Sequence, residues 1–155
     1  MFGPDDAFLT TIVKLLRKLP IYPMFGSGRT RLHPANVEDV AEAVAEAIAR
    51  VMRRAETHSR MFEFGGPRVY SYEGFLRAVA HQAGLAPRLI PIPLAVWHAV
   101  AWASEMFPSP LLTRNQVELM QIDTVTSPEV SGLVELGISP HSVKAIPQKV
   151  LSNCG

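Results

Sequence analysis

A glycine-rich turn, a short extended segment and the start of a helix follow one another in Gly26-Ser27-Gly28-Arg29-Thr30-Arg31-Leu32-His33-Pro34-Ala35-Asn36-Val37-Glu38-Asp39-Val40-Ala41. Asn36 suits a helix N-cap, because its side-chain oxygen can accept a free backbone N–H of the first turn. Beyond it, apolar residues recur at helical spacing, with acidic residues early and arginines late, as the helix dipole favours. The apolar positions are Val40, Ala41, Val44, Ile48, Val51 and Met52. We therefore predict an amphipathic helix that starts at Val37.

Upstream of this run, Phe2-Gly3-Pro4-Asp5-Asp6 leads into a second stretch with helical periodicity. Either aspartate can cap a helix over residues 7–18, which the prolines that follow should end. Residues 22–25 and 30–33 are short extended runs, and the glycines between them tolerate positive φ. These two runs are predicted to form a small hairpin or a loop pair.

Downstream, the pattern predicts two more short strands and several helices. Strands are expected at residues 60–65 and 88–92, between glycine and proline turns. Helices are expected from the cap Ser71 to Gly84, from Pro93 to about Phe107, after the capping box Thr113-x-x-Gln116, over residues 129–136, and from Ser139-Pro140 onward until Pro147 breaks or kinks the last one. Helices should thus dominate over strands that cannot close a sheet by themselves.

Composition excludes several classes of function. The chain has 155 residues, 48% hydrophobic and 19% charged, which is enough for a compact domain with its own core. A net charge of +1 offers no field that would favour a polyanion, so nucleic-acid binding is not expected. The lone Cys154 cannot form an internal disulfide, which fits a reducing compartment. The five histidines lack the spacing of zinc ligands, so no metal site is expected.

The longest apolar stretch, residues 89–107, is interrupted by two prolines, a histidine and a glutamate. This composition favours a buried or interfacial helix over one that spans a membrane. Trp97, Trp102, Met106 and Phe107 on this stretch could form an apolar patch that meets a partner subunit or a membrane surface. Burial inside a helical lobe is an equally good interpretation, because core helices have the same composition.

The Phe2-Gly3-Pro4 loop, followed by the later Val37-Glu38-Asp39-Val40-Ala41 run, resembles the second half of an extended short-chain dehydrogenase/reductase. This family has a Rossmann nucleotide-binding fold, in which such a loop follows a sheet strand and such a helix packs under the sheet. The resemblance implies an α/β, partial Rossmann-type fold with a mainly helical C-terminal lobe and a few short strands. The glycine-rich dinucleotide turn and the Tyr-x-x-x-Lys pair of the family would lie upstream of Met1. Gly26-Ser27-Gly28 is not that turn, since no helix follows it directly.

Several further runs narrow the resemblance: Pro23-Met24-Phe25-Gly26, Thr30-Arg31-Leu32-His33-Pro34, Phe62-Glu63-Phe64-Gly65-Gly66-Pro67, Leu89-Ile90-Pro91-Ile92-Pro93, Leu111-Leu112-Thr113-Arg114-Asn115-Gln116-Val117-Glu118-Leu119-Met120 and Leu136-Gly137-Ile138-Ser139-Pro140. Together they are most similar to the branch of the nucleotide-binding accessory subunit of respiratory complex I, alpha subcomplex subunit 9, and its bacterial relatives. Members of this branch hold a nicotinamide dinucleotide as a structural ligand and sit on the hydrophilic arm near the membrane.

The resemblance also suggests site residues. Phe2, Gly3 and Pro4 would border the nicotinamide of NAD or NADP in the complete protein, whereas this chain alone is expected to bind neither. Arg29, Arg31 and His33 lie where related sugar-nucleotide enzymes clamp a substrate phosphate with an arginine. An ungapped alignment instead puts Leu32 at that position, and solvated loop charges are the alternative interpretation. Asp39 is expected to serve the start of its helix rather than to act as a base.

The sequence thus predicts that residues 1–155 are a single, substrate-side C-terminal lobe without catalytic residues of its own. Its predicted role is structural or in assembly of an NADH:ubiquinone oxidoreductase, with an N-terminal Rossmann half or other subunits as partners and a peripheral membrane contact. The alternative is the substrate-binding lobe of an NAD(P)-dependent epimerase, dehydratase or reductase, and a free-standing interaction module is a third interpretation. The expected location is the cytoplasm or the cytoplasmic face of a bacterial inner membrane, or the matrix side in mitochondria.

Overall fold

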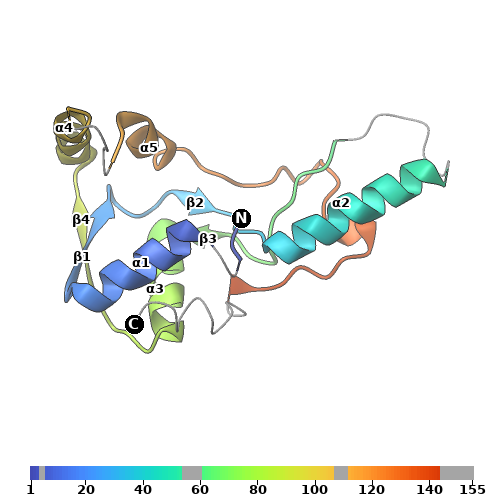
Figure 1. The fold of residues 1–155 in the computed structure, drawn as a ribbon, viewed down its shortest axis with the longest axis horizontal. Coiled ribbons are helices and arrows are strands. Elements are labelled where there is room, and N and C mark those ends of the chain that lie inside the picture. Colours follow the sequence, from blue (N-terminus) through green and yellow to red (C-terminus); the bar gives the residue numbers. More distant parts are fainter. Residues whose placement is uncertain (4–5, 54–60, 107–111, 144–155) are drawn as a thin grey trace. The chain divides into compact units, whose positions relative to one another are not determined.

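The structure is a computed structural model that describes residues 1–3, 6–53, 61–106 and 112–143. The architecture is mixed α/β, with helices predominating over a few short strands (Figure 1). The expected class, a partial Rossmann-type α/β fold, is thereby confirmed. The chain divides into two compact units, which we call unit 1 (Met1–Thr11, His33–Val69 and Val125–Gly155) and unit 2 (Ile12–Leu32 and Tyr70–Thr124). That the whole chain acts as one substrate-side lobe stays a prediction.

Unit 2 contains a two-stranded parallel sheet. Strand β1 (Ile21–Phe25) pairs with β4 (Arg88–Ile92), and the two strands lie side by side in Figure 1. Their register places Tyr22 opposite Leu89 and Phe25 opposite Ile92. A parallel pair needs a long crossover connection, which here includes every element between β1 and β4.

Strand β2 (Arg31–Leu32) pairs in antiparallel fashion with β3 (Tyr70–Ser71) and not with β1. The predicted hairpin between the two extended runs is therefore wrong. The glycines between them do adopt positive φ, 55° at Gly26 and 69° at Gly28. These glycines turn the chain from the β1–β4 sheet toward the β2–β3 sheet. Each of the two strands pairs with a strand that lies much later in the sequence.

The helices of unit 2 start where the capping residues predict. The hydroxyl of Ser71 accepts the N–H of Gly74 at 3.1 Å at the start of α3 (Tyr72–Gln82). Helix α5 (Arg114–Leu119) has the predicted capping box, with both reciprocal hydrogen bonds formed. Helix α4 (Leu94–Ser104) begins directly after Pro93 but ends earlier than predicted.

An aromatic cluster packs β1 against α3 and α4 within unit 2. The Phe25 ring lies 4.3 Å from that of Trp97 and 6.2 Å from that of Tyr72, measured between ring centroids. The indole N–H of Trp97 donates to the carbonyl oxygen of Met24 at 3.2 Å. Tyr22 and Tyr72 are both buried and hydrogen-bond to each other, and burial raises the pKa of both phenol groups. Both therefore stay neutral in the physiological pH range.

Unit 1 is organised around α2 (Val37–Met52), the helix predicted with most support from the sequence. Asn36 caps it, accepting the N–H of Glu38 at 2.9 Å. The inner face of α2 packs on the 3₁₀ turn Val134–Leu136 and on neighbouring apolar side chains. The core consists of Ala43, Leu133, Leu136 and Ile138, with Ala47, Phe62 and Phe64 packed against it.

Extended chain in unit 1 forms isolated parallel bridges rather than strands. Phe2 bridges to Asn36 and Phe62 bridges to Ser131. The predicted strand at residues 60–65 is therefore reduced, within the described residues, to the bridge at Phe62. Helix α1 (Ala7–Lys18) matches its predicted range, and its sequence runs from unit 1 into unit 2.

The helix predicted over residues 129–136 is wrong for most of its length. Only Val134–Leu136 forms a helical turn, which Gly137 ends at a φ of 84°. Ahead of it, side-chain carboxylates capture the backbone N–H groups of Ser127 and Gly132 and hold an irregular loop instead. The last predicted helix does not begin at Ser139-Pro140, because residues 139–142 are not helical, and the part after Val143 lies outside the described residues.

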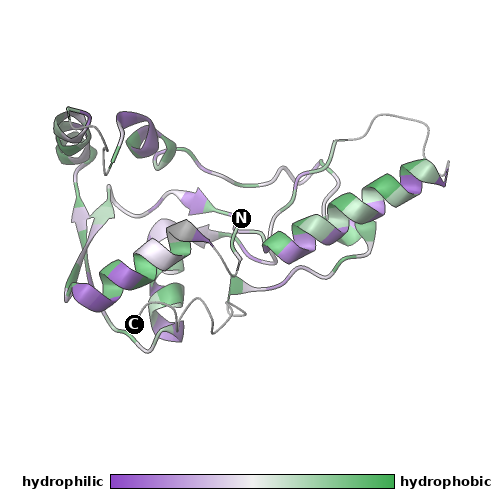
Figure 2. Cartoon of the chain, viewed as in Figure 1, coloured by the Kyte–Doolittle hydropathy of each residue, from purple (hydrophilic) through white to green (hydrophobic). Residues whose placement is uncertain are grey.

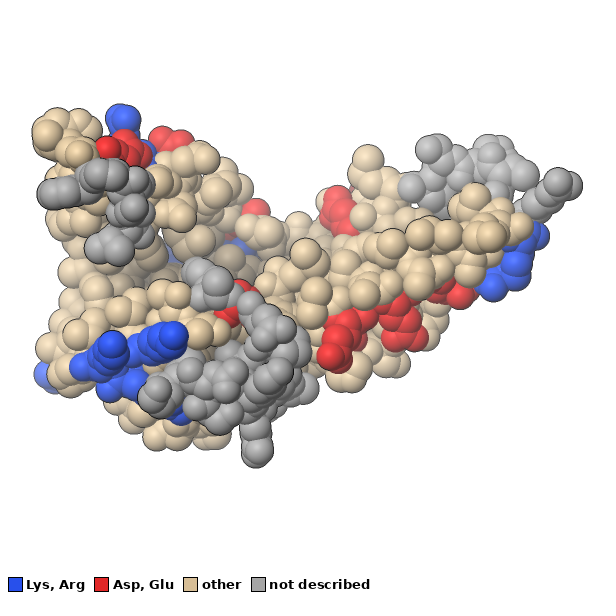
Figure 3. All heavy atoms as spheres, in the orientation of Figure 1, with Lys and Arg blue, Asp and Glu red and all other residues tan. Residues whose placement is uncertain are grey.

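Helix α2 also presents an exposed apolar face. Its members, which we call the α2 stripe, are Val37, Val44, Ile48, Val51 and Met52, with exposed fractions from 40% to 79%. Their spacing places all five on one side of the helix, away from the core. Figure 2 shows apolar residues along the whole of α2, and Figure 3 shows its acidic side chains gathered along one edge.

Helix α4 in unit 2 has a second exposed apolar face. Val96, Val100 and Trp102 are exposed, Trp102 by 60%, and so is Met106 just beyond the end of the helix. No Asp, Glu, Lys or Arg occurs between Arg88 and Glu105. Among the described residues, no helix has the length and apolar character required to cross a membrane.

Candidate functional site

A pocket of about 460 Å³ opens on unit 1. Residues of the loops 63–69 and 126–135 form most of its wall, together with His33 and Pro140. The volume lies within the range of small-molecule sites, which is roughly 300–1,000 Å³. Of the predicted site residues that the structure describes, His33 alone lines this pocket.

Both ring nitrogens of His33 are engaged. Nε2 lies 2.6 Å from the carbonyl oxygen of Gly66, and Nδ1 lies 2.9 Å from the hydroxyl of Thr126. A carbonyl oxygen can only accept, so Nε2 carries a proton and donates it. In the neutral ring Nδ1 is then the acceptor, and the Thr126 hydroxyl donates to it. The ring is thus fixed between two loops of unit 1.

The same arrangement, a hydroxyl that donates a hydrogen bond to an imidazole, is found in nucleophilic catalysis, where the imidazole removes the hydroxyl proton. In such sites a carboxylate on the other ring nitrogen stabilises the imidazolium that forms. His33 has the neutral carbonyl of Gly66 in that place. The contact with Thr126 therefore fits a positioning role for His33 better than proton transfer.

Two glycines allow the loop of residues 65–66 to pack closely against His33 and Pro34. A Cβ on Gly65 would overlap the His33 ring, and a Cβ on Gly66 would overlap the carbonyl oxygen of Pro34. The run Phe62-Glu63-Phe64-Gly65-Gly66-Pro67 therefore needs its paired glycines for steric reasons. The sequence pattern predicts only a turn at these glycines and not their contact with His33.

The carboxylates of Glu63 and Glu135, which line the pocket, accept hydrogen bonds from backbone N–H groups. Glu63 accepts the N–H of Ser127 at 2.6 Å, and Glu135 accepts that of Gly132 at 2.7 Å. The amide of Gly132, with a smaller contribution from the backbone of Glu135 itself, lowers the pKa of the Glu135 carboxyl. No cluster of three or more His, Cys, Asp or Glu suited to a metal ion occurs among the described residues.

Asp39 has a different role from the one predicted. Its buried carboxylate accepts the backbone N–H of His141 at 2.6 Å and contacts Nδ1 of the same residue at 2.5 Å. Asn36, not Asp39, caps the helix. The hydrogen bond to Asp39, reinforced by its charge and by those of Glu38 and Glu42, raises the pKa of the His141 imidazole. His141 was missed in the sequence, because its partner lies far away along the chain.

Arg29 and Arg31 lie in unit 2, whereas His33 lies in unit 1. Arg31 is anchored by Asp123, whose carboxylate accepts the backbone N–H at 2.7 Å and Nε–H at 2.8 Å. These bonds, the backbone bond first, lower the pKa of the Asp123 carboxyl. Arg29 is exposed. The clamp role assigned to these residues stays a prediction.

The predicted cofactor loop is part of the core of unit 1. The N–H of Phe2 donates to the carbonyl oxygen of Ala35 and its carbonyl oxygen accepts from Val37, both at 2.8 Å. The Phe2 side chain is buried, and a Cβ on Gly3 would overlap Val37. Pro4 lies outside the described residues. Contact of this loop with a nicotinamide stays a prediction.

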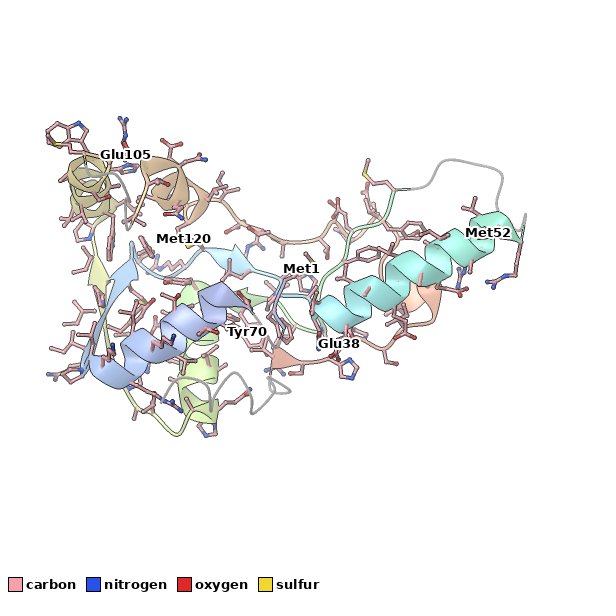
Figure 4. The ribbon with its side chains drawn as sticks, in the orientation of Figure 1. Met1, Glu38, Met52, Tyr70, Glu105 and Met120 are labelled. Carbon is pink, nitrogen blue, oxygen red and sulfur yellow. The ribbon has the colours of Figure 1, made fainter. Side chains whose placement is uncertain are left out.

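The apolar patch predicted on residues 97–107 is divided by the structure. Trp97 packs inward on Phe25, whereas Trp102 and Met106 are exposed. Glu105, which directly follows α4, is labelled in Figure 4. Phe107 lies outside the described residues. Of the three described members, Trp97 therefore packs within unit 2, whereas Trp102 and Met106 lie on the surface.

Known proteins resemble the chain over nearly its whole length. It is 24% identical to NADH dehydrogenase (ubiquinone) 1 alpha subcomplex subunit 9, mitochondrial, of Arabidopsis thaliana, and 28% identical to the protein of the same name from Rattus norvegicus. Each comparison covers 97% of this chain but only 39% of the relative. The resemblance to the complex I alpha subcomplex subunit 9 branch is thereby confirmed. No protein-family model matches the chain.

The fold is also similar to that of a solved protein. The crystal structure of gox2253 superposes with a TM-score of 0.59 over 95% of this chain and 43% of that chain, at 21% sequence identity. At this identity the likeness supports the fold alone. In sequence and in structure, then, the chain spans well under half the length of the proteins that it matches.

Proposed function

We propose that this chain is part of an accessory subunit of an NADH:ubiquinone oxidoreductase, with a structural or assembly role rather than a catalytic one. The observation that carries the proposal is the similarity to complex I alpha subcomplex subunit 9 from a plant and from a mammal, over 97% of the chain. The geometry supports it, since the bonds of His33 and Asp39 tie loops together rather than activate a nucleophile.

The α2 stripe supports a partner in this assembly. Five aliphatic side chains on one helix face, 40% to 79% exposed, favour burial against another protein surface. We propose that this surface is supplied by the N-terminal Rossmann half expected for the family, or by another subunit. In that complete protein Phe2, Gly3 and Pro4 would lie near NAD or NADP, which this chain alone would not retain.

The uncharged, exposed side of α4 supports the predicted peripheral contact with a membrane. Val96, Val100 and Trp102 could enter the interface between headgroups and acyl chains without burying a charge. The corresponding location is the cytoplasmic face of a bacterial inner membrane, or the matrix side of a mitochondrial one.

The test is to tag the chain in its native cell, extract membranes with a mild detergent and separate the complexes by native electrophoresis. We expect the tagged chain to comigrate with NADH dehydrogenase activity, and its deletion to reduce the amount of assembled complex. A chain that migrates apart from this activity, with normal amounts of assembled complex after deletion, would overturn the proposal.

One observation favours the alternative of a substrate-binding lobe. Asp123 holds Arg31 through Nε and the backbone, so the terminal nitrogens of its guanidinium are positioned to bind a phosphate. Titration with a nucleotide sugar, compared between the native chain and the variants Arg31→Ala and Arg29→Ala, tests this role. Micromolar binding that Arg31→Ala alone abolishes would favour the enzyme-type lobe, whereas absence of binding favours the accessory role.

A further inference from the structure

The carboxylate of Asp39 is nearly inaccessible to water, and the two hydrogen bonds that it forms with described residues both involve His141. The Asp39 side chain is 2% exposed and that of His141 is 60% exposed. Burying a carboxylate is unfavourable unless hydrogen bonds or an opposite charge compensate for the lost water. The state of His141 therefore determines how well this buried charge is compensated.

The contact joins the first turn of α2 to residues 138–143. Ile138 belongs to the core of unit 1 and Val143 is buried, so this segment is anchored on both sides of His141. Pro140, directly before His141, lines the pocket. The carbonyl oxygen of His141 also faces Gly66, at 3.7 Å from the position of a Cβ on that residue. A change at His141 would thus reach both the pocket wall and the loop that holds His33.

The charged side chains that act on His141 from α2 are all negative. Asp39 lies in direct contact, and Glu38 and Glu42 add negative charge from the same helix. The hydrogen bond to Asp39 makes the largest contribution to the raised pKa of His141, and the negative charges of Asp39, Glu38 and Glu42 raise it further. Desolvation of the imidazole lowers this pKa. On the other elements of this region, Arg68 lies beyond Gly66 in the loop, and Glu63 and Glu135 line the pocket.

We propose that Asp39 and His141 form a pH-sensitive latch, which fastens residues 138–143 and the Pro140 wall of the pocket to α2 while the imidazole is charged, and loosens them when it is neutral. In the charged state the bond to the carboxylate is charge-assisted, and such bonds are roughly twice as strong as neutral ones. In the neutral state the buried carboxylate keeps its hydrogen bonds but loses its counter-charge.

The direction of the pH effect follows from linkage. A histidine whose pKa is higher in the folded state contributes stability that is fully present below its unfolded pKa. This contribution is lost as the pH rises through the folded pKa. The latch is therefore tight on the acidic side and weakens on the basic side of the ordinary histidine range.

The test uses the full chain with labelled histidines, titrated by NMR from about pH 5 to about pH 9, across the histidine range. In parallel, hydrogen exchange reports the protection of the backbone amides of residues 138–143. We expect this protection to fall as His141 loses its proton, by about tenfold for each unit that separates its folded and unfolded pKa.

Two variants separate the latch from general effects of pH. His141→Asn keeps a neutral donor beside Asp39 but cannot titrate, so the protection of residues 138–143 should no longer depend on pH. His81→Asn, on α3 in unit 2, is the matched control and should behave as the native chain. Unchanged pH dependence in His141→Asn would overturn the proposal. If that variant does not fold, the native titration decides: the latch requires His141 to lose its proton at a higher pH in the folded chain than in the chain unfolded in urea.

Discussion

Serine substitutions at Val44 and Ile48 should weaken assembly without unfolding the chain. These side chains are 46% and 55% exposed, so roughly half of each is already buried in the isolated chain. We expect the double substitution to lower the free energy of unfolding by about 1.5–3 kcal/mol, which leaves the chain folded. The substitutions should also act on whatever surface covers the α2 stripe.

The size of that effect follows from the exposed fractions. Burying an aliphatic side chain completely contributes about 1.5–3 kcal/mol, and the exposed parts of these two amount to roughly one such side chain. Losing this contribution should weaken the association by roughly 10- to 100-fold, at about 1.4 kcal/mol for each factor of ten. The whole stripe, with roughly three side chains' worth of exposed surface, could contribute about 4–8 kcal/mol.

Native electrophoresis of cells that express the tagged variant measures the fraction of chain that comigrates with NADH dehydrogenase activity. Binding of a fluorescent hydrophobic dye to the purified chain should fall in the same variant. Met61→Ser is the control, because Met61 is 75% exposed but lies outside α2. The reasoning fails if the double variant assembles like the native chain, or if it loses well over about 3 kcal/mol of stability by denaturant titration.

Three further outcomes are expected. Gly65→Ala should destabilise unit 1 by about 1–3 kcal/mol, because its Cβ would displace the His33 ring; a melting temperature equal to that of the native chain would contradict the packing described. Trp102→Ser should reduce cosedimentation with phospholipid vesicles while leaving the melting temperature unchanged, and equal cosedimentation would argue against a membrane contact through α4. Glu135→Gln should reduce the loss of stability in acid. The pKa of Glu135 is lowered in the folded chain, so its contribution to folding stability is fully present above the ordinary pKa of 4.5. This contribution is lost as the pH falls through the folded pKa. Chemical denaturation at several acidic pH values measures this, and parallel curves for the variant and the native chain would show that the bond to Gly132 contributes nothing.

Local signals in the sequence predicted the helices well. Asn36, Ser71 and the Thr113–Gln116 capping box each mark a helix start that the structure reproduces, because a cap acts through atoms only two or three residues away. The helix predicted over residues 129–136, of which only Val134–Leu136 is helical, lacked such a cap. Glu135 accepts the backbone N–H of Gly132 inside this range, and Glu63 accepts that of Ser127 just before it.

Strand partners and side-chain pairs could not be predicted in the same way. The two extended runs near Gly26 looked like a hairpin, but their partners are β4 and β3, many residues downstream. The bonds of His33 to Thr126 and of Asp39 to His141 likewise join distant parts of the chain. Nothing local to either residue encodes its partner, so a single sequence shows the residue types but not the pairs.

The pairing of β1 with β4 has a consequence for the order in which the protein forms during synthesis. When β1 leaves the ribosome, its partner has not yet been translated, and the whole of α2 and α3 must follow first. The peptide groups of Ile21–Phe25 therefore stay unpaired, and its apolar side chains stay exposed, until Arg88–Ile92 has been synthesised. A nascent chain stalled before β4 should be a preferred client of chaperones that hold extended apolar segments.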